Sequence, residues 1–185
     1  MESPVPLYTE LAMEEKTEQQ VLEESVTDPG QFDEIVSRYY DELCRYASKT
    51  LGDADLAGDI AEEALFRCYE RRAKLAKAGQ GCRSWLYRVA TNLMMSSFDR
   101  HAAAERHVER TAFSLSQPAE QDVDVAGQVL DALARCTVAE RAVVTLRYFE
   151  QMPGSEIAHL TGKTSASVRV TLHRALEHMR RLLEE

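Results

Sequence analysis

Hydrophobic side chains recur at three- and four-residue steps over most of the chain after residue 30. The first run covers residues 31–51 and is typical of the buried face of an amphipathic helix. Gly52 predicts its end, because glycine favours the position after the last helical residue. A second helix is predicted over residues 54–76. The expected inward positions of the two helices are Phe32, Ile35, Val36, Tyr39, Tyr40, Leu43 and Tyr46, then Leu56, Ile60, Ala64, Leu65, Cys68 and Leu75.

The stretch GCRSWLYRVATNL, residues 81–93, contains the only Trp of the chain. It predicts a third helix after a short loop, with Ser84 near its N-cap. Trp85 falls at the edge of the core side, where it either braces the loop or stacks on a base, and packing is favoured. The helical projection places Leu86, Val89, Ala90 and Leu93 in the core, and Ser84, Arg88, Thr91 and Met95 opposite, with Tyr87 on one flank.

The helical pattern returns at residue 128. Short helices are predicted over residues 128–135 and 138–151, and Pro153 suits the first turn of another. A tight turn at Gly162 then leads into a long helix with Val168, Leu172, Ala175, Leu176, Met179 and Leu183 facing inward. Helix, short glycine turn and helix form a helix-turn-helix unit, whose second helix enters the major groove of DNA.

The chain therefore reads as all-α, because strand-type alternation is absent. Two small helical modules are predicted, joined by a flexible linker. The expected division is an acidic flexible N-terminal extension (1–30), a first module (31–110), an acidic linker (111–127) and a second module (128–185).

The net charge of −9 is unusual for a protein that binds nucleic acid, but the charges are unevenly distributed. Residues 1–30 carry one basic and eight acidic side chains, whereas residues 73–110 carry seven basic and three acidic ones. Residues 132–185 carry eight basic and six acidic side chains. Such asymmetry bears on partners rather than on fold. It fits DNA binding by both modules and a regulatory role for the acidic extension.

Several other classes of protein lack support. No apolar run approaches a membrane span, and the N-terminus lacks the features of a secretory signal, so a cytoplasmic protein is expected. The four Cys form no CxxC pair and the five His lack metal-binding spacing, so neither a metal nor another cofactor is predicted. Without a phosphate-binding loop or a nucleophile elbow, an enzyme is the weakest alternative.

Three motifs in order resemble a known family. The stretches DADLAGDIAEEALFRCYERR, CRSWLYRVATNL and AERAVVTLRYFEQMPGSEIAHLTGKTSASVRVTLHRAL look like regions 2.2, 2.3–2.4 and 4 of bacterial sigma factors. Their order and the lack of a region 3 are similar to the extracytoplasmic-function (ECF) subgroup of the sigma-70 family. The resemblance covers about residues 31–183.

The resemblance implies a function and a set of contact residues. It implies an initiation factor that binds core RNA polymerase at the beta′ clamp helices and the beta flap, directs it to promoter DNA and helps to open the −10 element. An anti-sigma factor is a further expected partner. The implied polymerase contacts are Asp59, Glu62, Glu63, Phe66 and Arg67. The implied −10 contacts are Gln80, Arg83, Trp85, Tyr87, Arg88, Thr91 and Asn92. The implied −35 contacts are Ser165, Ser167, Arg169, Thr171, His173 and Arg174.

The sequence departs from the family at a few positions, and one alternative stays open. Glu62 stands where the family usually has Gln, Cys82 where it often has Phe, and Ser96-Ser97 where it often has Asp-Arg. A stand-alone helix-turn-helix regulator remains the main alternative, although such a regulator has no need of the first module.

Overall fold

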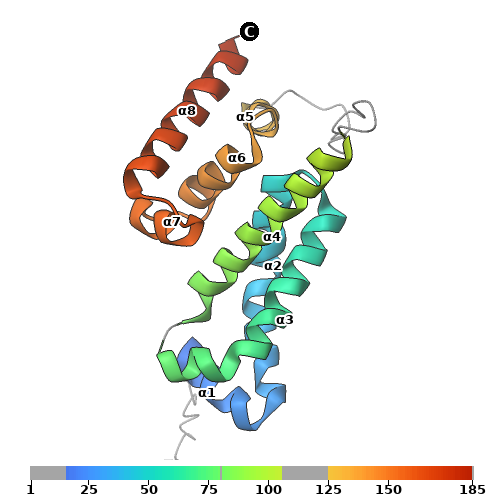
Figure 1. Ribbon diagram of the computed structural model, residues 1–185, viewed down its shortest axis with the longest axis vertical. Helices are drawn as coiled ribbons and strands as arrows, with labels where there is room; N and C mark the ends of the chain where they lie inside the picture. The colour runs from blue at the N-terminus through green and yellow to red at the C-terminus, as the bar shows by residue number, and fades with distance from the viewer. Residues whose placement is uncertain (1–15, 80, 106–124, 185) are drawn as a thin grey trace, which may run out of the picture.

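A computed structural model describes residues 16–79, 81–105 and 125–184, and every regular element in these ranges is a helix (Figure 1). The all-α prediction is confirmed. The elements are α1 (Glu18–Thr27), the 3-10 helix η1 (Pro29–Phe32), α2 (Asp33–Leu51), α3 (Ala54–Ala78), α4 (Cys82–Glu105), α5 (Val125–Ala134), α6 (Val138–Val144), the π-helical turn η2 (Thr145–Phe149), α7 (Gly154–Thr161) and α8 (Ser165–Glu184).

The first module is a bundle of α2, α3 and α4, with α1 across one end (Figure 1). Gly52 ends α2 in the left-handed conformation at φ 77°, as its position predicts. Asp53 then caps α3, because its side chain accepts a hydrogen bond from the backbone N–H of Leu56 at 3.0 Å. The predicted core of the two helices is largely observed, with Ile35, Leu43 and Tyr46 fully buried.

Helix α4 differs from its prediction in two ways. It begins at Cys82, so Ser84 lies inside the helix and not at its N-cap. The prediction for the exposed side is also wrong, because Tyr87 and Thr91 are buried at 0% and 2% exposure. The reason is that α4 is covered twice: α2 and α3 lie on one side, and α6 and α7 of the second module lie on another.

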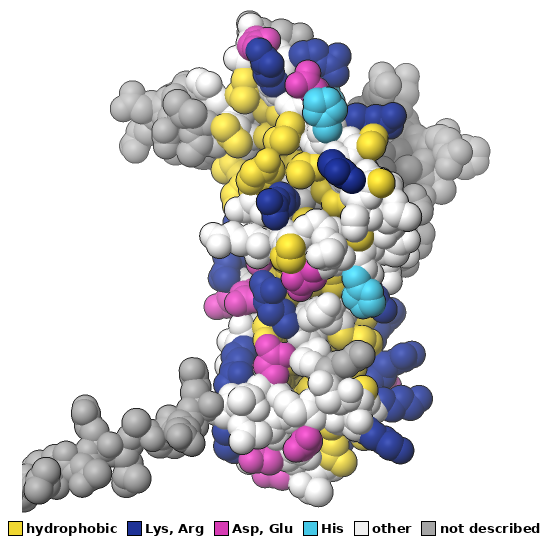
Figure 2. All heavy atoms as spheres, turned by 90° about the vertical axis from the view of Figure 1, so that its left-hand side faces the viewer, with side chains coloured by type: hydrophobic (Ala, Val, Ile, Leu, Met, Phe, Trp, Pro, Cys, Tyr) yellow, Lys and Arg dark blue, Asp and Glu magenta, His cyan; other side chains and the backbone are white. Residues whose placement is uncertain are grey.

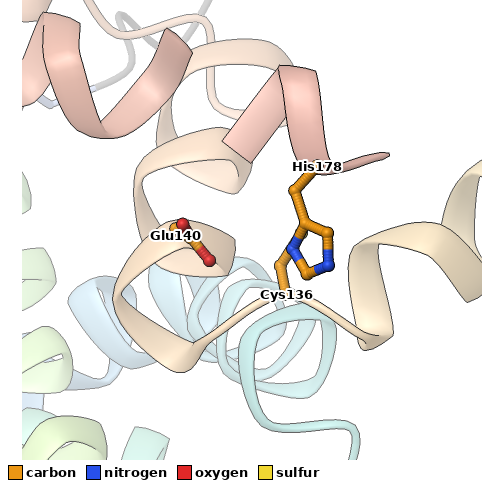
Figure 3. Close-up of side chains that lie close together, drawn as sticks. All are labelled: Cys136, Glu140 and His178. Carbon is orange, nitrogen blue, oxygen red and sulfur yellow. The ribbon is translucent and has the colours of Figure 1, made fainter. Parts of the chain in front are cut away.

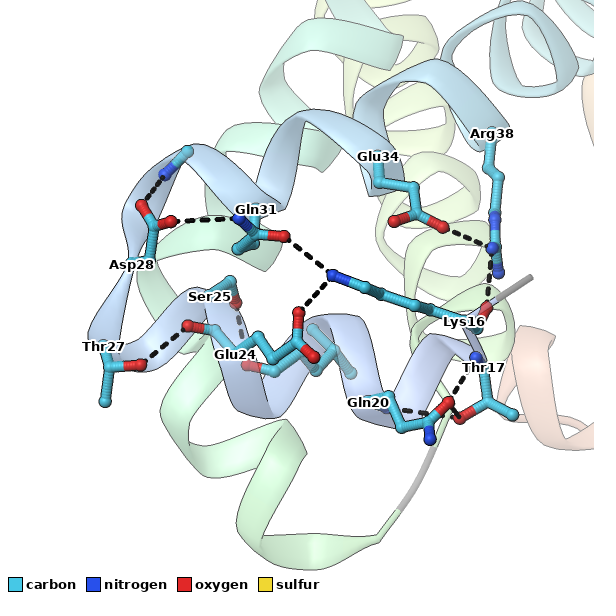
Figure 4. Close-up of polar contacts among 12 residues, drawn as sticks. Lys16, Thr17, Gln20, Glu24, Ser25, Thr27, Asp28, Gln31, Glu34 and Arg38 are labelled. Atoms are coloured by element: carbon cyan, nitrogen blue, oxygen red, sulfur yellow. Dashed lines mark hydrogen bonds and ion pairs between the residues drawn. The ribbon is translucent and has the colours of Figure 1, made fainter. Parts of the chain in front are cut away.

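The prediction that residues 1–30 form a flexible extension is wrong for residues 16–30. Val21 and Leu22 of α1 are completely buried, and α1 packs mainly on α3. A capping box between Thr17 and Gln20 starts the helix. Figure 4 shows the polar contacts that hold α1 against α2. Lys16 donates to Glu24 at 2.5 Å, and Arg38 of α2 donates to the Lys16 carbonyl at 2.7 Å.

The second module, α5 to α8, contains the predicted helix-turn-helix. Gly162 forms the turn between α7 and α8 at φ 66°. Pro153 precedes α7 as its N-cap and does not lie inside the first turn. A capping box between Thr137 and Glu140 starts α6. Helix α8 packs through Val168, Ala175 and Met179, and residues 111–124 of the predicted linker lie outside the described residues.

The two modules pack against each other. Helix α7 lies along α4, and α6 contacts both α2 and α4 (Figure 1). One hydrophobic cluster crosses the boundary, joining Leu86 and Tyr87 of α4 with Leu146, Ile157 and Leu160 of the second module. In this arrangement the second module covers part of α4, the helix that carries the predicted −10 contacts.

Candidate nucleic-acid and partner-protein interfaces

The predicted polymerase contacts share one solvent-facing side of α3. Asp59, Glu62 and Arg67 are exposed and Glu63 is half-buried. Phe66 is 57% exposed, and Glu62 and Glu63 lie four and three residues before it on the same helix face. The opposite side is buried and contains Ile60, Ala61, Ala64, Leu65 and Cys68.

Two features of this side of α3 are typical of a protein-docking surface. A large apolar ring exposed among charged residues offers a central anchor with a polar rim. Glu63 and Arg67 form an ion pair across one helical turn, with 2.7 Å between Oε1 and Nε. This pair helps to fix the positions of the charged side chains around Phe66. The five residues predicted from the motif therefore lie together on a side of α3 that solvent reaches.

The predicted −10 contacts separate into accessible and buried side chains. Arg83, Trp85 and Arg88 are half-buried and Asn92 is exposed. Thr91 is instead an internal hydrogen-bonding residue: its hydroxyl lies 2.9 Å from that of Tyr46 and donates to the Tyr87 carbonyl at 2.7 Å. Gln80 lies outside the described residues.

Tyr87 connects the two modules. Its hydroxyl donates to Glu150 Oε2 at 2.5 Å, and Arg83 lies 4.0 Å from the same oxygen. The Arg83 guanidinium also stands over the Tyr87 ring, 5.1 Å from its centroid. Burial, and then the negative charge of Glu150, raise the pKa of Tyr87 far above its ordinary value. The phenol therefore stays protonated and keeps donating to Glu150.

The second module also reaches Arg88 and Asn92. One terminal nitrogen of Arg88 contacts His159 Nε2 of α7, while Arg88 Nε is buried without a partner in the structure. A pocket of about 200 Å³ lies here, lined by Arg88, Asn92, His159, Leu160, Thr161 and Gly162. The helix-turn-helix thus contacts Arg88 and lies close to Asn92, two side chains suited to base or phosphate contact.

The structure adds Glu18 of α1 to the surroundings of this site, which sequence reasoning missed. The Glu18 carboxylate accepts from the Tyr39 hydroxyl and lies 3.4 Å from the backbone N–H of Arg83 and 3.6 Å from Cys82 Sγ. A carboxylate at the first turn of α4 stabilises the positive end of the helix dipole. Only the tertiary contact of α1 reveals this role, because Glu18 lies far from α4 in sequence.

The predicted −35 contacts lie at the start of α8. Ser165, Ser167, Arg169, His173 and Arg174 are exposed and Thr171 is half-buried. Small hydroxyl side chains next to an arginine suit an approach to base edges in the major groove.

Thr164 was missed as the residue that fixes the start of this helix. Its hydroxyl accepts a hydrogen bond from the backbone N–H of Ser167 at 3.1 Å. A Thr immediately before a helical run is an N-cap signal that sequence reasoning could have used.

Figure 2 looks onto the side of the molecule that carries α7 and α8. Basic and acidic side chains are interspersed along it, and hydrophobic side chains gather in its upper part. Exposed apolar residues of α8 include Val170, Leu176 and Leu183. No continuous basic surface covers this view, so the face that it shows offers few phosphate contacts.

Among the described residues, no helix is both long enough and apolar enough to cross a membrane. The four cysteines are free thiols: Cys68, Cys82 and Cys136 are buried and Cys44 is half-buried.

Each of the two modules matches a known protein family. Residues 35–104 match the family described as Sigma-70 region 2, and residues 126–179 match Sigma-70, region 4. The chain is 30% identical over 161 residues to the ECF RNA polymerase sigma factor SigL of Mycobacterium tuberculosis, covering 82% of this chain and 90% of that protein. It is 32% identical over 155 residues to the RNA polymerase sigma-E factor of Streptomyces avermitilis, covering 83% and 86%.

Solved structures show the same fold. The sigma factor RpoE of Bartonella quintana, solved in complex with the anti-sigma factor NepR, aligns with a TM-score of 0.69 at 16% identity, covering 83% of this chain and 96% of that chain. CnrH, solved with the cytosolic domain of CnrY, aligns with a TM-score of 0.65 at 18% identity, covering 90% and 97%.

The fold and its surfaces thus define a two-module, DNA-binding transcription factor. The chain belongs to the ECF subgroup of the sigma-70 family. Its function is promoter-specific initiation of transcription with RNA polymerase.

Proposed function

We propose that the chain divides this function among three helix surfaces. The exposed side of α3, centred on Phe66, docks on the clamp helices of core polymerase. The first half of α4 reads the −10 element, and the start of α8 reads the −35 element. The observation that carries the assignment is Phe66, which remains 57% exposed while α3 is otherwise anchored in the bundle core. An exposed aromatic ring surrounded by charged residues is the kind of central anchor on which the binding energy of a protein interface concentrates.

The −10 surface follows from which side chains of α4 reach solvent. Arg83, Trp85, Arg88 and Asn92, together with Gln80, are the proposed direct contacts. Bases flipped from a duplex are held by aromatic stacking and by edge contacts from Arg and Asn. Thr91 supports the surface from within the bundle. Tyr87 joins the surface only when Glu150 no longer covers it.

The contacts between the modules imply that binding is linked to opening. Two residues of the second module contact side chains of α4. Glu150 contacts Tyr87 and Arg83, and His159 contacts Arg88. While α7 lies on α4, Tyr87 is buried, and Arg83 and Arg88 are only partly accessible to promoter DNA. The packed form is therefore the resting form, and polymerase and DNA together favour the open one by differential binding.

The proposed partners follow from the family. They are core polymerase, at the beta′ clamp helices and beta flap, promoter DNA and an anti-sigma factor. The last is supported by the similar fold of RpoE, which was solved in complex with the anti-sigma factor NepR. The initiation factor acts in the cytoplasm, where the transcribed DNA lies. Its role is non-catalytic and needs no cofactor. Its modules are residues 31–110 and 128–185, with α5 extending the second module back to Val125.

Transcription with core polymerase and a randomised promoter library tests these assignments. Arg88→Ala is expected to relax selection only at −10 positions, and Arg169→Ala only at −35 positions. Lys74→Ala, an exposed basic residue of α3 outside both sets, serves as the matched control. Equal selection profiles for all three variants would contradict the assignment, and absence of transcription with the unaltered chain would contradict the function.

A further inference from the structure

Cys136 and Glu140 lie close in sequence, and His178, which is distant from both, joins them in the second module (Figure 3). One ligand atom of each, the Sγ, a carboxylate oxygen and a ring nitrogen, lies within 4.8 Å of the other two. Cys136 follows α5, Glu140 lies in the first turn of α6 and His178 is on α8. The cluster therefore spans the place where the long recognition helix packs on the rest of its module.

The local structure positions all three side chains. Cys136 is 4% exposed and belongs to a small apolar cluster with Leu133, Ala175 and Met179, which holds α8 against α5. The same packing places His178, the residue before Met179, beside the thiol. Glu140 and His178 therefore project from helices, and Cys136 lies in the short turn between α5 and α6, where apolar packing holds it in place.

Glu140 is oriented by the capping box of α6. Its Oε2 accepts hydrogen bonds from the Thr137 backbone N–H at 3.0 Å and from the Thr137 hydroxyl at 2.9 Å. These bonds use one oxygen, so the other retains its lone pairs for a ligand. A carboxylate held by such outer hydrogen bonds is typical of metal sites.

The combination of thiol, imidazole and carboxylate selects a class of ligand. Calcium and magnesium prefer oxygen ligands alone, whereas a thiolate with an imidazole favours zinc and similar transition metals. Tetrahedral zinc needs ligand atoms about 3.6 Å apart, given metal–ligand distances of about 2.0–2.3 Å. Half-buried Glu140 and His178 can close the remaining gap by side-chain rotation.

The charges of the two acidic ligands match a divalent cation, although the buried Arg141 guanidinium also lies near Cys136. A thiolate and a carboxylate together neutralise a charge of +2, while a neutral protein site would leave a buried cation uncompensated. A surface pocket of about 400 Å³ opens beside the cluster, lined by Glu140, His173, Arg174, Glu177, His178 and Arg181. The pocket provides access and room for water at a fourth position, and its arginines extend from the exposed side of α8, where solvent screens them.

We propose that Cys136, Glu140 and His178 bind one zinc-class divalent ion that fastens α8 to the α5–α6 turn. On binding, the Cys136 thiol releases its proton to solvent and the sulfur forms the metal bond. The ion then stabilises the folded helix-turn-helix module, because the three ligands are together only in the folded state. This site does not depend on the proposed promoter contacts.

Metal binding is tested on the full chain without polymerase or DNA. After treatment with a chelator, the chain is titrated with Co²⁺ and then Zn²⁺. One equivalent of Co²⁺ is expected to give tetrahedral d–d bands and sulfur-to-cobalt charge-transfer absorption, which Zn²⁺ abolishes by displacement. Saturating Zn²⁺ is expected to raise the unfolding temperature.

Matched variants identify the ligands. Glu140→Gln keeps a capping oxygen, so the module folds, and it is expected to weaken Zn²⁺ affinity at least about tenfold. Cys136→Ser is expected to remove the charge-transfer band, and His178→Gln to weaken binding similarly. Cys44→Ser, which removes a thiol elsewhere in the chain, is expected to retain the affinity of the unaltered chain.

Three results would overturn the site. One is an unaltered chain that binds Zn²⁺ no more tightly than Cys136→Ser. Another is an octahedral cobalt spectrum without thiolate absorption. The third is loss of binding in a control variant while Glu140→Gln and His178→Gln retain it.

Discussion

Phe66 and Thr91 show that single residues take their roles from exposure as much as from their motif. Both belong to stretches that resemble functional regions of the family. Phe66 is 57% exposed on α3, whereas Thr91 is 2% exposed inside the bundle. The first residue is therefore available to a partner, and the second stabilises the fold.

Phe66→Ala is expected to reduce affinity for core polymerase at least about tenfold, because a central aromatic anchor carries a large share of interface energy. The midpoint of thermal unfolding should change little, since the ring is mostly exposed. A binding titration with labelled core polymerase measures the effect. Val26→Ala removes another exposed apolar side chain, on α1, and should bind normally; equal losses for both variants would refute a specific anchor.

Thr91→Val is expected to lower the free energy of unfolding by about 1–3 kcal/mol, because the buried Tyr46 hydroxyl loses its partner. Urea denaturation measures the loss. In the double variant with Tyr46→Phe the cost should be smaller than the sum of the single costs. A variant of full stability that fails to bind promoter DNA would restore Thr91 as a direct contact.

At the scale of elements, α1 is the largest departure from the prediction. Its residues read as part of a polar, acidic extension, since residues 1–30 carry a net charge of −7. Two adjacent apolar residues, Val21 and Leu22, are nevertheless sufficient to bury the helix on α3, with polar contacts at its ends. Through Glu18 the same helix reaches the start of α4, so α1 supports the proposed −10 surface.

Leu22→Ala is expected to cost about 2–5 kcal/mol of stability, because the side chain is completely buried. The neighbouring Glu23 is exposed, so Glu23→Ala should change stability by less than about 0.5 kcal/mol. Chemical denaturation of both variants gives the comparison. Equal stability of the two variants would show that α1 does not dock in solution.

At the scale of the whole molecule, the second module covers the first. Helices α6 and α7 lie on α2 and α4, and Glu150 accepts a hydrogen bond from the buried Tyr87. Lys49 of α2 also stands over the Phe149 ring, 4.3 Å from its centroid. These contacts favour a closed form, in which helices of the second module cover part of the proposed −10 surface.

Glu150→Ala is expected to favour the open form, because Tyr87 loses its acceptor and Arg83 its ion pair. The free energy difference of about 1–3 kcal/mol corresponds to a roughly 5- to 150-fold change in the ratio of open to closed forms. Amide hydrogen exchange in α4 and α7 should become faster, and affinity for single-stranded promoter DNA should rise. Glu156→Ala, which removes the same charge from α7, is the control; identical exchange in the two variants would argue against this contact.

The amino-acid sequence by itself determined the local structure of this protein. Helix periodicity, the caps at Gly52 and Gly162 and the order of three motifs were sufficient for the all-α fold, the helix-turn-helix and the family. These features depend on neighbours within a few residues, which a sequence displays directly. The exposed face of α3 could be predicted for the same reason.

Only the tertiary structure decided what covers each helix. Periodicity identifies an apolar face but gives no information on a second layer, so the burial of Tyr87 and Thr91 under two sets of helices was not predictable. The docking of α1 through Val21 and Leu22 depends on a receiving surface on α3. The approach of His178 to Cys136 and Glu140 likewise depends on how α8 packs, because side chains far apart in sequence meet only when the helices between them are placed.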